Sequence, residues 1–125
     1  MNLGTRLNNW LNIRYLSANN WRGQIGEEKG FCKFDTVEHG LRAAGIILKK
    51  YIKKGVNTPE NIIKRYAPSE ENDTEQYINL VCGWTGFDRD EKLTYTCIPS
   101  LMYGMTKMET GNILSSQQMK DLWKY

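Results

Sequence analysis

The chain has 125 residues, of which 40% are hydrophobic and 25% are charged. A chain of this length and composition can bury one hydrophobic core, so an intrinsically disordered protein is excluded. The formal net charge of +3 favours an anionic partner without choosing among nucleic acid, phospholipid and wall polymer. The longest apolar run, residues 43–48, is far shorter than the roughly 20 residues of a membrane span. We therefore expect one domain, residues 1–125, with no membrane insertion.

The N-terminus and the cysteines bear on where the protein acts. Polar residues, including Arg14, interrupt the apolar stretch of a signal peptide, so we expect synthesis in the cytoplasm without an export signal. The three cysteines, Cys32, Cys82 and Cys97, have no CxxC spacing, which favours buried free thiols over a disulfide framework or a zinc site. The only histidine is His39, so no metal or cofactor is expected.

The first third of the chain is rich in Asn, Gly and aromatic residues and predicts a small β-lobe. Short extended segments are expected at residues 12–15 and 30–34, separated by the turn-like sequence NNWRGQIGEEKG at residues 19–30. From Thr36 onward, apolar residues recur at helical spacing. They predict a long helix with Thr36 as its N-cap and Gly55 at its end.

Shorter helices are expected in the rest of the chain, where capping residues and prolines mark their ends. They begin at Thr58–Pro59, at Asn72 or Asp73, at Pro99 and at Ser115 or Ser116, and the first three end at Pro68, in residues 83–86 and at Gly111. The predicted fold class is therefore mainly α (α+β), a helical domain with a small N-terminal β-lobe.

Carboxylates are the side chains in this sequence best suited to catalysis. Glycoside hydrolysis needs one protonated acid for the leaving oxygen and often a second carboxylate. Glu109 lies near the end of an apolar helix, where Met105 and Met108 would raise its pKa by desolvation; the alternative is an exposed glutamate at a helix C-terminus. Glu38, at the start of the long helix, is either a second carboxylate or a first-turn charge favoured by the helix dipole.

Several motifs, in this order, resemble a family of small bacteriophage and prophage proteins. They are NNWLNIRY at 8–15, WRG at 21–23, GFCKFDTVEHGLRAA at 30–44 and RYAPSEENDTEQYI at 65–78. The corresponding patterns of that family are similar to NNPGNIR, WxG, FxxFxxxxxGxRA and WAPPxENxTxxY, and the match covers about residues 4–87. Trp10-Leu11 and Tyr66 depart from these patterns. The resemblance implies a virion structural protein or a lysozyme-like protein.

The same region is similar to bacterial glucosaminidases, in which a helix ending in Glu-Ser-Gly precedes NNLFGIK, a Trp, an aromatic-rich strand and a helix. Asn9, Trp21, residues 31–34 and the predicted long helix follow that order. The helix with the catalytic glutamate is missing upstream. In a circularly permuted lysozyme-like domain, residues 102–111 would supply it, with Glu109 as the acid. This hypothesis requires Glu109 to lie beside Asn9 and Arg14.

The leading hypothesis is a peptidoglycan glycosidase or lytic transglycosylase of lysozyme-like type. It would be a phage lysin or an injected effector that acts from the virion or in the host periplasm and cell wall. Its partner would be the glycan strand, with no nucleic acid expected. Glu109 would be the catalytic acid, assisted by Glu38. The residues expected to contact substrate are Asn9, Asn12, Arg14, Tyr66, Asn72 and Tyr77.

Two other classes of protein remain open. A non-catalytic virion or injection-apparatus protein would carry its carboxylates as surface groups and would lose nothing on Glu109→Gln substitution. A nucleic-acid-binding module would use the basic cluster Lys49, Lys50, Lys53, Lys54, Lys64 and Arg65. Lysines are common at helix C-termini because of the helix dipole, which weakens this last reading.

Overall fold

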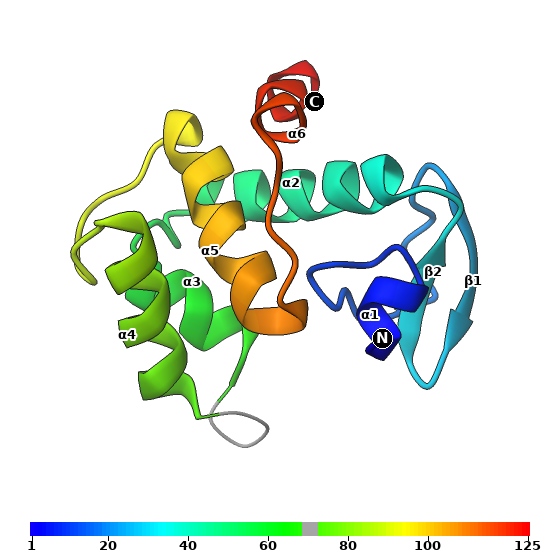
Figure 1. The fold of residues 1–125 in the computed structure, drawn as a ribbon. Coiled ribbons are helices and arrows are strands. Elements are labelled where there is room, and N and C mark those ends of the chain that lie inside the picture. Colours follow the sequence, from blue (N-terminus) through cyan, green and yellow to red (C-terminus); the bar gives the residue numbers. More distant parts are fainter. Residues whose placement is uncertain (69–72) are drawn as a thin grey trace.

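The computed structural model describes residues 1–68 and 73–125. In these ranges, helices account for most of the ordered structure, and a two-stranded antiparallel sheet lies to one side of them (Figure 1). The fold class is mainly α with a small β part, as the sequence predicts.

The N-terminal lobe consists of a one-turn helix and a hairpin. Helix α1 spans Leu3–Arg6, and strands β1, Gln24–Glu28, and β2, Phe31–Phe34, pair antiparallel. The hairpin closes through Lys29 and Gly30, whose φ angles of 53° and 87° match the twist of two-residue hairpin turns. The predicted turn at 19–30 is wrong in its second half, because β1 lies there. Strand β1 has one apolar side chain, Ile25, which is 60% exposed. The strand therefore lacks the alternation of apolar and polar residues that predicts a strand from sequence.

The segment predicted to be extended at residues 12–15 forms only an isolated bridge between Arg14 and Phe31. The second extended segment is confirmed as β2. Helix α1 was not predicted, since four residues are too few to show a helical period.

The helices of the second lobe begin at the predicted caps, except that α5 begins at Ile98, one residue before the predicted Pro99. Their bounds are α2 Val37–Lys53, α3 Pro59–Tyr66, α4 Thr74–Thr85, α5 Ile98–Thr110 and α6 Ser116–Asp121, with 3-10 turns at Tyr95–Cys97 and Leu122–Lys124. The side chains of Thr36, Thr58, Asp73 and Ser115 each accept a hydrogen bond from the backbone N–H three residues later. These bonds satisfy amides that the helix itself leaves unpaired, which confirms the four caps.

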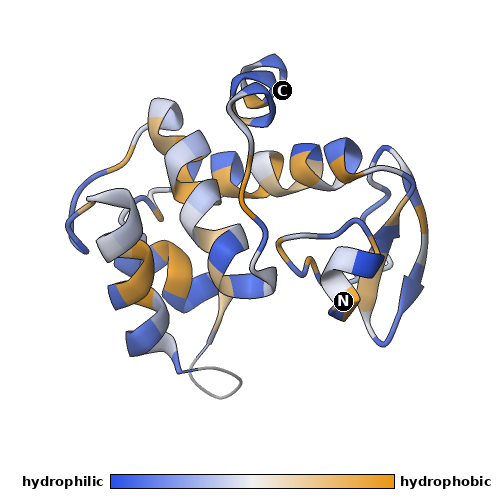
Figure 2. Ribbon diagram, in the orientation of Figure 1, coloured by the Kyte–Doolittle hydropathy of each residue, from blue (hydrophilic) through white to orange (hydrophobic). Residues whose placement is uncertain are grey.

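Helix α5 lies at the centre of the helical lobe and packs against α4 and α2 (Figure 1). Its apolar side chains Leu101, Met102 and Met105 are 0% exposed, and they meet Leu48 of α2 and Ile78 of α4 in one hydrophobic core. Figure 2 shows hydrophobic residues interspersed among hydrophilic ones along α2 and α4. Burying a side chain of this size stabilises a fold by about 1.5–3 kcal/mol, so this core holds the helices in place.

The N-terminal lobe meets α2 at a close backbone contact. A Cβ atom on Gly40 would lie 2.1 Å from the carbonyl oxygen of Asn8, so only glycine permits this approach. The contact brings the loop after α1 against the first turns of α2.

The cysteines are free thiols, as predicted, although only Cys32 is buried; Cys82 and Cys97 are half-buried. Among the described helices, none is long and apolar enough to span a membrane.

Candidate active site

A cleft of about 420 Å³ opens where the two lobes meet. Its walls come from the loop after α1, from the N-terminal end of β2, from α2 and α3, and from the C-terminal end of α5. The lining residues used below are Asn12, Arg14, Phe31, Ile47, Tyr51, Tyr66 and Glu109. The cleft therefore joins segments that are far apart in the sequence.

The partly buried carboxyl of Glu109 is held by two donors. Its Oε1 accepts a hydrogen bond from Asn12 Nδ2 at 3.0 Å, and its Oε2 accepts one from the Tyr77 hydroxyl at 2.9 Å. Burial raises the pKa of Glu109 above its ordinary value, while the bonds from Asn12 and Tyr77 and the charge of Arg14 lower it; burial is the largest effect. Glu109 thus lines the cleft with a raised pKa, as expected from the sequence.

Hydrogen bonds join the C-terminal end of α5 to the N-terminal segment, although the two lie near opposite ends of the sequence. Asn2 Nδ2 donates to the Thr110 carbonyl oxygen at 2.8 Å, and the Thr110 hydroxyl donates to the Trp10 carbonyl oxygen at 2.9 Å. A further bond joins Asn112 Nδ2 to Thr5 Oγ1 at 2.8 Å. These bonds hold the loop at the end of α5, where Asn12 meets Glu109.

Gly4 is part of this junction because no side chain fits there. A Cβ atom on Gly4 would lie 2.3 Å from Asn12 Oδ1 and 2.7 Å from the Asn9 carbonyl oxygen. Any larger residue would push the Asn12 loop away from Glu109.

Asn9 does not contact the cleft, so the expectation that it binds substrate is wrong. Its side chain is 0% exposed. Its Oδ1 accepts from the Ile13 N–H at 2.8 Å, and its Nδ2 donates to the carbonyl oxygens of Ile13 and Cys32 at 3.0 and 2.9 Å. The Asn9 side chain therefore makes its hydrogen bonds to backbone groups. These bonds fix the shape of the loop that contains Asn12.

The two predicted tyrosines occupy different positions. Tyr66 lines the cleft, and its hydroxyl donates to the Leu11 carbonyl oxygen at 2.5 Å. Tyr77 is only 2% exposed, and its hydroxyl donates a hydrogen bond to Glu109. The expectation that Tyr77 contacts substrate is therefore wrong. Burial raises the pKa of both phenols well above the ordinary value, and the charge of Glu109 adds to the rise. Both tyrosines therefore stay neutral at the pH of a cell.

Glu38 does not share the cleft with Glu109, and that expectation is wrong as well. The Thr36 cap places Glu38 in the first turn of α2, where it is exposed and lines a shallow hollow with Gln118 and Asp121. A carboxylate in the first turn is favoured by the helix dipole. Among the described residues that line the cleft, Glu109 is the only carboxylate. Asn72, another expected contact, lies outside the described residues.

Two lining residues, Ile47 and Tyr51, lie in no motif, and a third, Phe31, lies in the FxxF motif but was not predicted to contact substrate. Ile47 and Tyr51 are four residues apart on α2 and so share one face of that helix. This spacing is the same one that predicts a core-facing stripe, which is why sequence alone assigns both residues to the core. Their position gives the cleft an apolar and aromatic wall.

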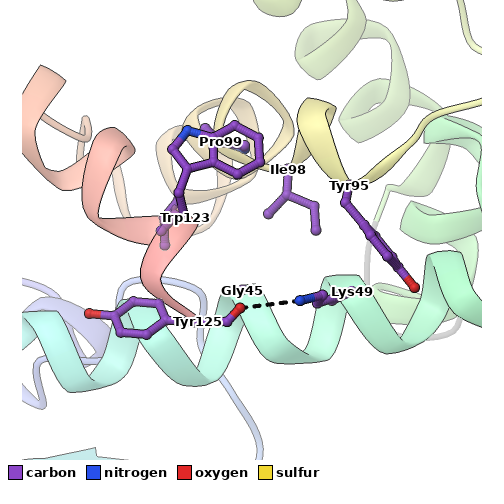
Figure 3. Close-up of a pocket in the computed structure, with 8 residues that line it drawn as sticks. Gly45, Lys49, Tyr95, Ile98, Pro99, Trp123 and Tyr125 are labelled. Carbon is purple, nitrogen blue, oxygen red and sulfur yellow. Dashed lines mark hydrogen bonds between the residues drawn. The ribbon is translucent and has the colours of Figure 1, made fainter.

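A second, smaller hollow of about 60 Å³ lies on the other side of α2 (Figure 3). Tyr95 and Trp123 stand at its two sides with Ile98 between them. The Lys49 ammonium donates to the Tyr125 carbonyl oxygen at 3.2 Å and lies 5.2 Å from the Tyr95 ring centroid. No carboxylate is found among the residues that line this hollow in the described part of the chain. In this it differs from the larger cleft, which contains the Glu109 carboxyl.

Part of the basic cluster on α2 is engaged with aromatic rings. Besides Lys49 over Tyr95, the Lys50 ammonium lies 5.7 Å from the Trp21 ring centroid. Cation–π contacts of this kind contribute to packing, which gives these two lysines a role within the fold.

Comparison with known proteins identifies a relative from a bacteriophage. Over 114 aligned residues the chain is 42% identical to Protein P5 of Pseudoalteromonas phage PM2. The alignment covers 87% of this chain and 71% of that protein, so the similarity extends over both lobes. No model of a protein family matches the sequence.

Proposed function

This chain belongs to the bacteriophage protein family of Protein P5 from phage PM2, and we propose that it cleaves the glycan strands of bacterial peptidoglycan. The observation that carries the proposal is the Glu109 carboxyl, which lies in a cleft of about 420 Å³ and has a pKa raised by burial. A glycosidase needs such an acid, because the leaving oxygen must receive a proton as its bond breaks.

The proposed reaction begins with proton transfer from Glu109 to the glycosidic oxygen. The bond between that oxygen and C1 of the sugar then breaks, and positive charge develops on the sugar ring. Glu109 is left as a carboxylate, which accepts hydrogen bonds from Asn12 and Tyr77. These two donors stabilise the charge that forms on the acid during the step.

The second half of the reaction has two possible nucleophiles. In a hydrolase, water adds to C1 and returns a proton to Glu109. In a lytic transglycosylase, the 6-hydroxyl of the same sugar adds to C1, the proton returns to Glu109 and an anhydro sugar forms. The two reactions leave different product ends, which identifies the enzyme class.

The walls of the cleft support a sugar ligand. Phe31, Tyr51 and Tyr66 place aromatic side chains along it, and flat rings pack against the faces of sugar rings. The acid lies on α5, downstream of the loop that resembles the glucosaminidase motif, which is the chain order of the hypothesised circular permutation. Asn9 does not lie in the cleft with Glu109, so only part of what that hypothesis requires is met. A protein of this kind would act from the virion or in the periplasm and wall of the host.

The test is release of soluble muropeptides from purified walls by the wild type, Glu109→Gln and Glu38→Gln, with products read by mass. Loss of the general acid is expected to lower release by about 10²- to 10⁴-fold. Glu38→Gln is the matched control, because its carboxylate lies outside the cleft, and its release should equal that of the wild type. Thermal unfolding of each variant separates lost activity from lost fold.

Anhydro ends among the products would identify a transglycosylase, and reducing ends a hydrolase. No release by the wild type from walls of several bacterial types would overturn the proposal and favour a non-catalytic virion protein.

A further inference from the structure

The peptide unit between Leu11 and Asn12 is held at both of its polar groups. Its carbonyl oxygen, that of Leu11, accepts the hydrogen bond from the Tyr66 hydroxyl at 2.5 Å. Its N–H, that of Asn12, donates to the Asn9 carbonyl oxygen at 3.1 Å. A peptide unit is planar, so bonds at its two opposite edges fix its orientation. Of these two bonds, the one from Tyr66 comes from outside the loop, because Tyr66 lies on α3.

The orientation of this peptide matters because Asn12 has a left-handed backbone, with a φ angle of 54°. Residues other than glycine seldom adopt this region, and they keep it where surrounding contacts hold them there. The neighbouring carbonyl oxygens are held as well, that of Trp10 by the Thr110 hydroxyl at 2.9 Å and that of Ile13 by the Cys32 N–H at 3.0 Å. Bonds from α3, α5 and β2 therefore set the direction in which the Asn12 side chain leaves the loop.

That direction leads to the acid. Asn12 Nδ2 donates to Glu109 Oε1 at 3.0 Å, whereas the hydrogen of the Tyr66 hydroxyl is donated to the Leu11 carbonyl oxygen. The Tyr66 hydroxyl is therefore connected to Glu109 through the loop, by way of the Leu11–Asn12 peptide and the Asn12 amide.

We infer that Tyr66 is a positioning residue for Glu109, whose hydroxyl holds the Leu11–Asn12 peptide and thereby keeps the Asn12 amide on the acid. The hydroxyl and the ring of Tyr66 thus have different roles, since the ring is part of the cleft wall. The inference rests on the proposed function where activity is measured, and the protonation of Glu109 tests it without any cleavage.

Loss of this positioning changes the acid in a stated direction. The hydrogen bond from Asn12 lowers the pKa of Glu109, so a displaced Asn12 lets that pKa rise. Among the described residues, the other groups that act on this pKa are Tyr77 from α4 and Arg14 from the N-terminal segment, and substitution of Tyr66 leaves both side chains in place. We therefore expect Tyr66→Phe to raise the pKa of Glu109.

The first experiment titrates the Glu109 carboxyl by carbon-13 NMR in the wild type, Tyr66→Phe and Tyr51→Phe, with its signal assigned by Glu109→Gln. Tyr51→Phe is the matched control, because Tyr51 lines the same cleft and its hydroxyl makes no hydrogen bond to a described residue. The pKa of Glu109 should rise in Tyr66→Phe and stay at the wild-type value in Tyr51→Phe. An unchanged pKa in a folded Tyr66→Phe protein would overturn the inference.

A double-mutant cycle tests whether the effect passes through Asn12. Asn12→Gly removes the amide, and glycine suits the φ angle of 54° at this position. This change alone should raise the pKa of Glu109 at least as far as Tyr66→Phe does. Adding Tyr66→Phe to Asn12→Gly should raise it no further, because coupled residues are not additive. An equal rise in both backgrounds would show that Tyr66 acts on Glu109 directly, against the inference.

The activity measurement separates positioning from contact with substrate. On soluble glycan fragments, Tyr66→Phe should lower kcat by about 10-fold, since a displaced group costs rate, and should leave KM near the wild-type value because the ring remains. A loss confined to KM would make the hydroxyl a substrate contact and overturn the inference. If the wild type cuts no glycan, the proposed function fails, and the two NMR experiments still decide whether Tyr66 positions Asn12 on Glu109.

Discussion

Helix α2 separates two hollows of different chemistry. Ile47 and Tyr51 face the cleft of about 420 Å³, whereas Gly45 and Lys49 face the hollow of about 60 Å³. Residues two apart on a helix point in nearly opposite directions, since each residue advances the helix by about 100°. One helix can therefore form a wall of both.

The two hollows differ in how their charged groups are satisfied. In the cleft, the Glu109 carboxyl is desolvated and has a raised pKa, which is a cost to stability. In the small hollow, Lys49 is bonded to a carbonyl oxygen and covers the Tyr95 ring. A titratable group whose burial destabilises the fold marks a functional site better than a charged group whose position is explained by packing. This comparison predicts large effects on activity at the cleft and small ones at the hollow.

The largest of the effects predicted from this comparison is that of Gly4→Ala. The new methyl group would meet Asn12 Oδ1 and the Asn9 backbone, and displacement of the loop would move Asn12 away from Glu109. Overpacking of this kind costs about 1–3 kcal/mol in the free energy of unfolding. A small misplacement of a catalytic group lowers activity by about 100-fold. Chemical denaturation measures the loss of stability, and muropeptide release measures the loss of activity.

Gly26→Ala is the matched control for this change. Nothing lies within 4 Å of the Cβ that it would add. Stability and release close to those of the wild type are expected for Gly26→Ala. Equal release by the Gly4 and Gly26 variants would show that the loop position does not matter to the acid.

A smaller effect is predicted for Tyr77→Phe, which sharpens the role of the groups behind Glu109. The Tyr77 hydroxyl donates to the carboxylate and lowers the pKa of Glu109. Without this bond the pKa rises further, so the protonated acid persists to higher pH. The alkaline limb of the pH–activity profile should therefore move to higher pH, with a loss of about 10-fold at the optimum. An unmoved limb would mean that Tyr77 does not tune the acid.

The smallest effect is predicted for Trp123→Ala in the small hollow. Trp123 is 56% exposed, and the change removes one wall of the hollow without reaching the cleft. Muropeptide release should stay at the wild-type level, and the free energy of unfolding should fall by about 1 kcal/mol or less. A large loss of release would break the distinction between the two faces of α2.

Much of the helical architecture could be predicted because helix ends depend on near neighbours. Thr36, Thr58, Asp73 and Ser115 each bond to a backbone N–H three residues away, so the signal and the structure lie in the same short window. Strand β1 could not be predicted. Its pairing with β2 and the Lys29–Gly30 turn define it, whereas its own residues show no alternation.

The sequence by itself determined where the helices of the second lobe lie, and it singled out Glu109, because an acid near the end of an apolar helix is a local pattern. Only the tertiary structure decided its surroundings. Asn12 reaches Glu109 from 97 residues away, and Tyr77 reaches it from 32. Packing likewise buries Asn9, whose side chain bonds to the backbone, and places Glu38 on a part of the surface away from the cleft. Contacts between distant segments follow from how whole helices pack, and no short stretch of sequence contains that information.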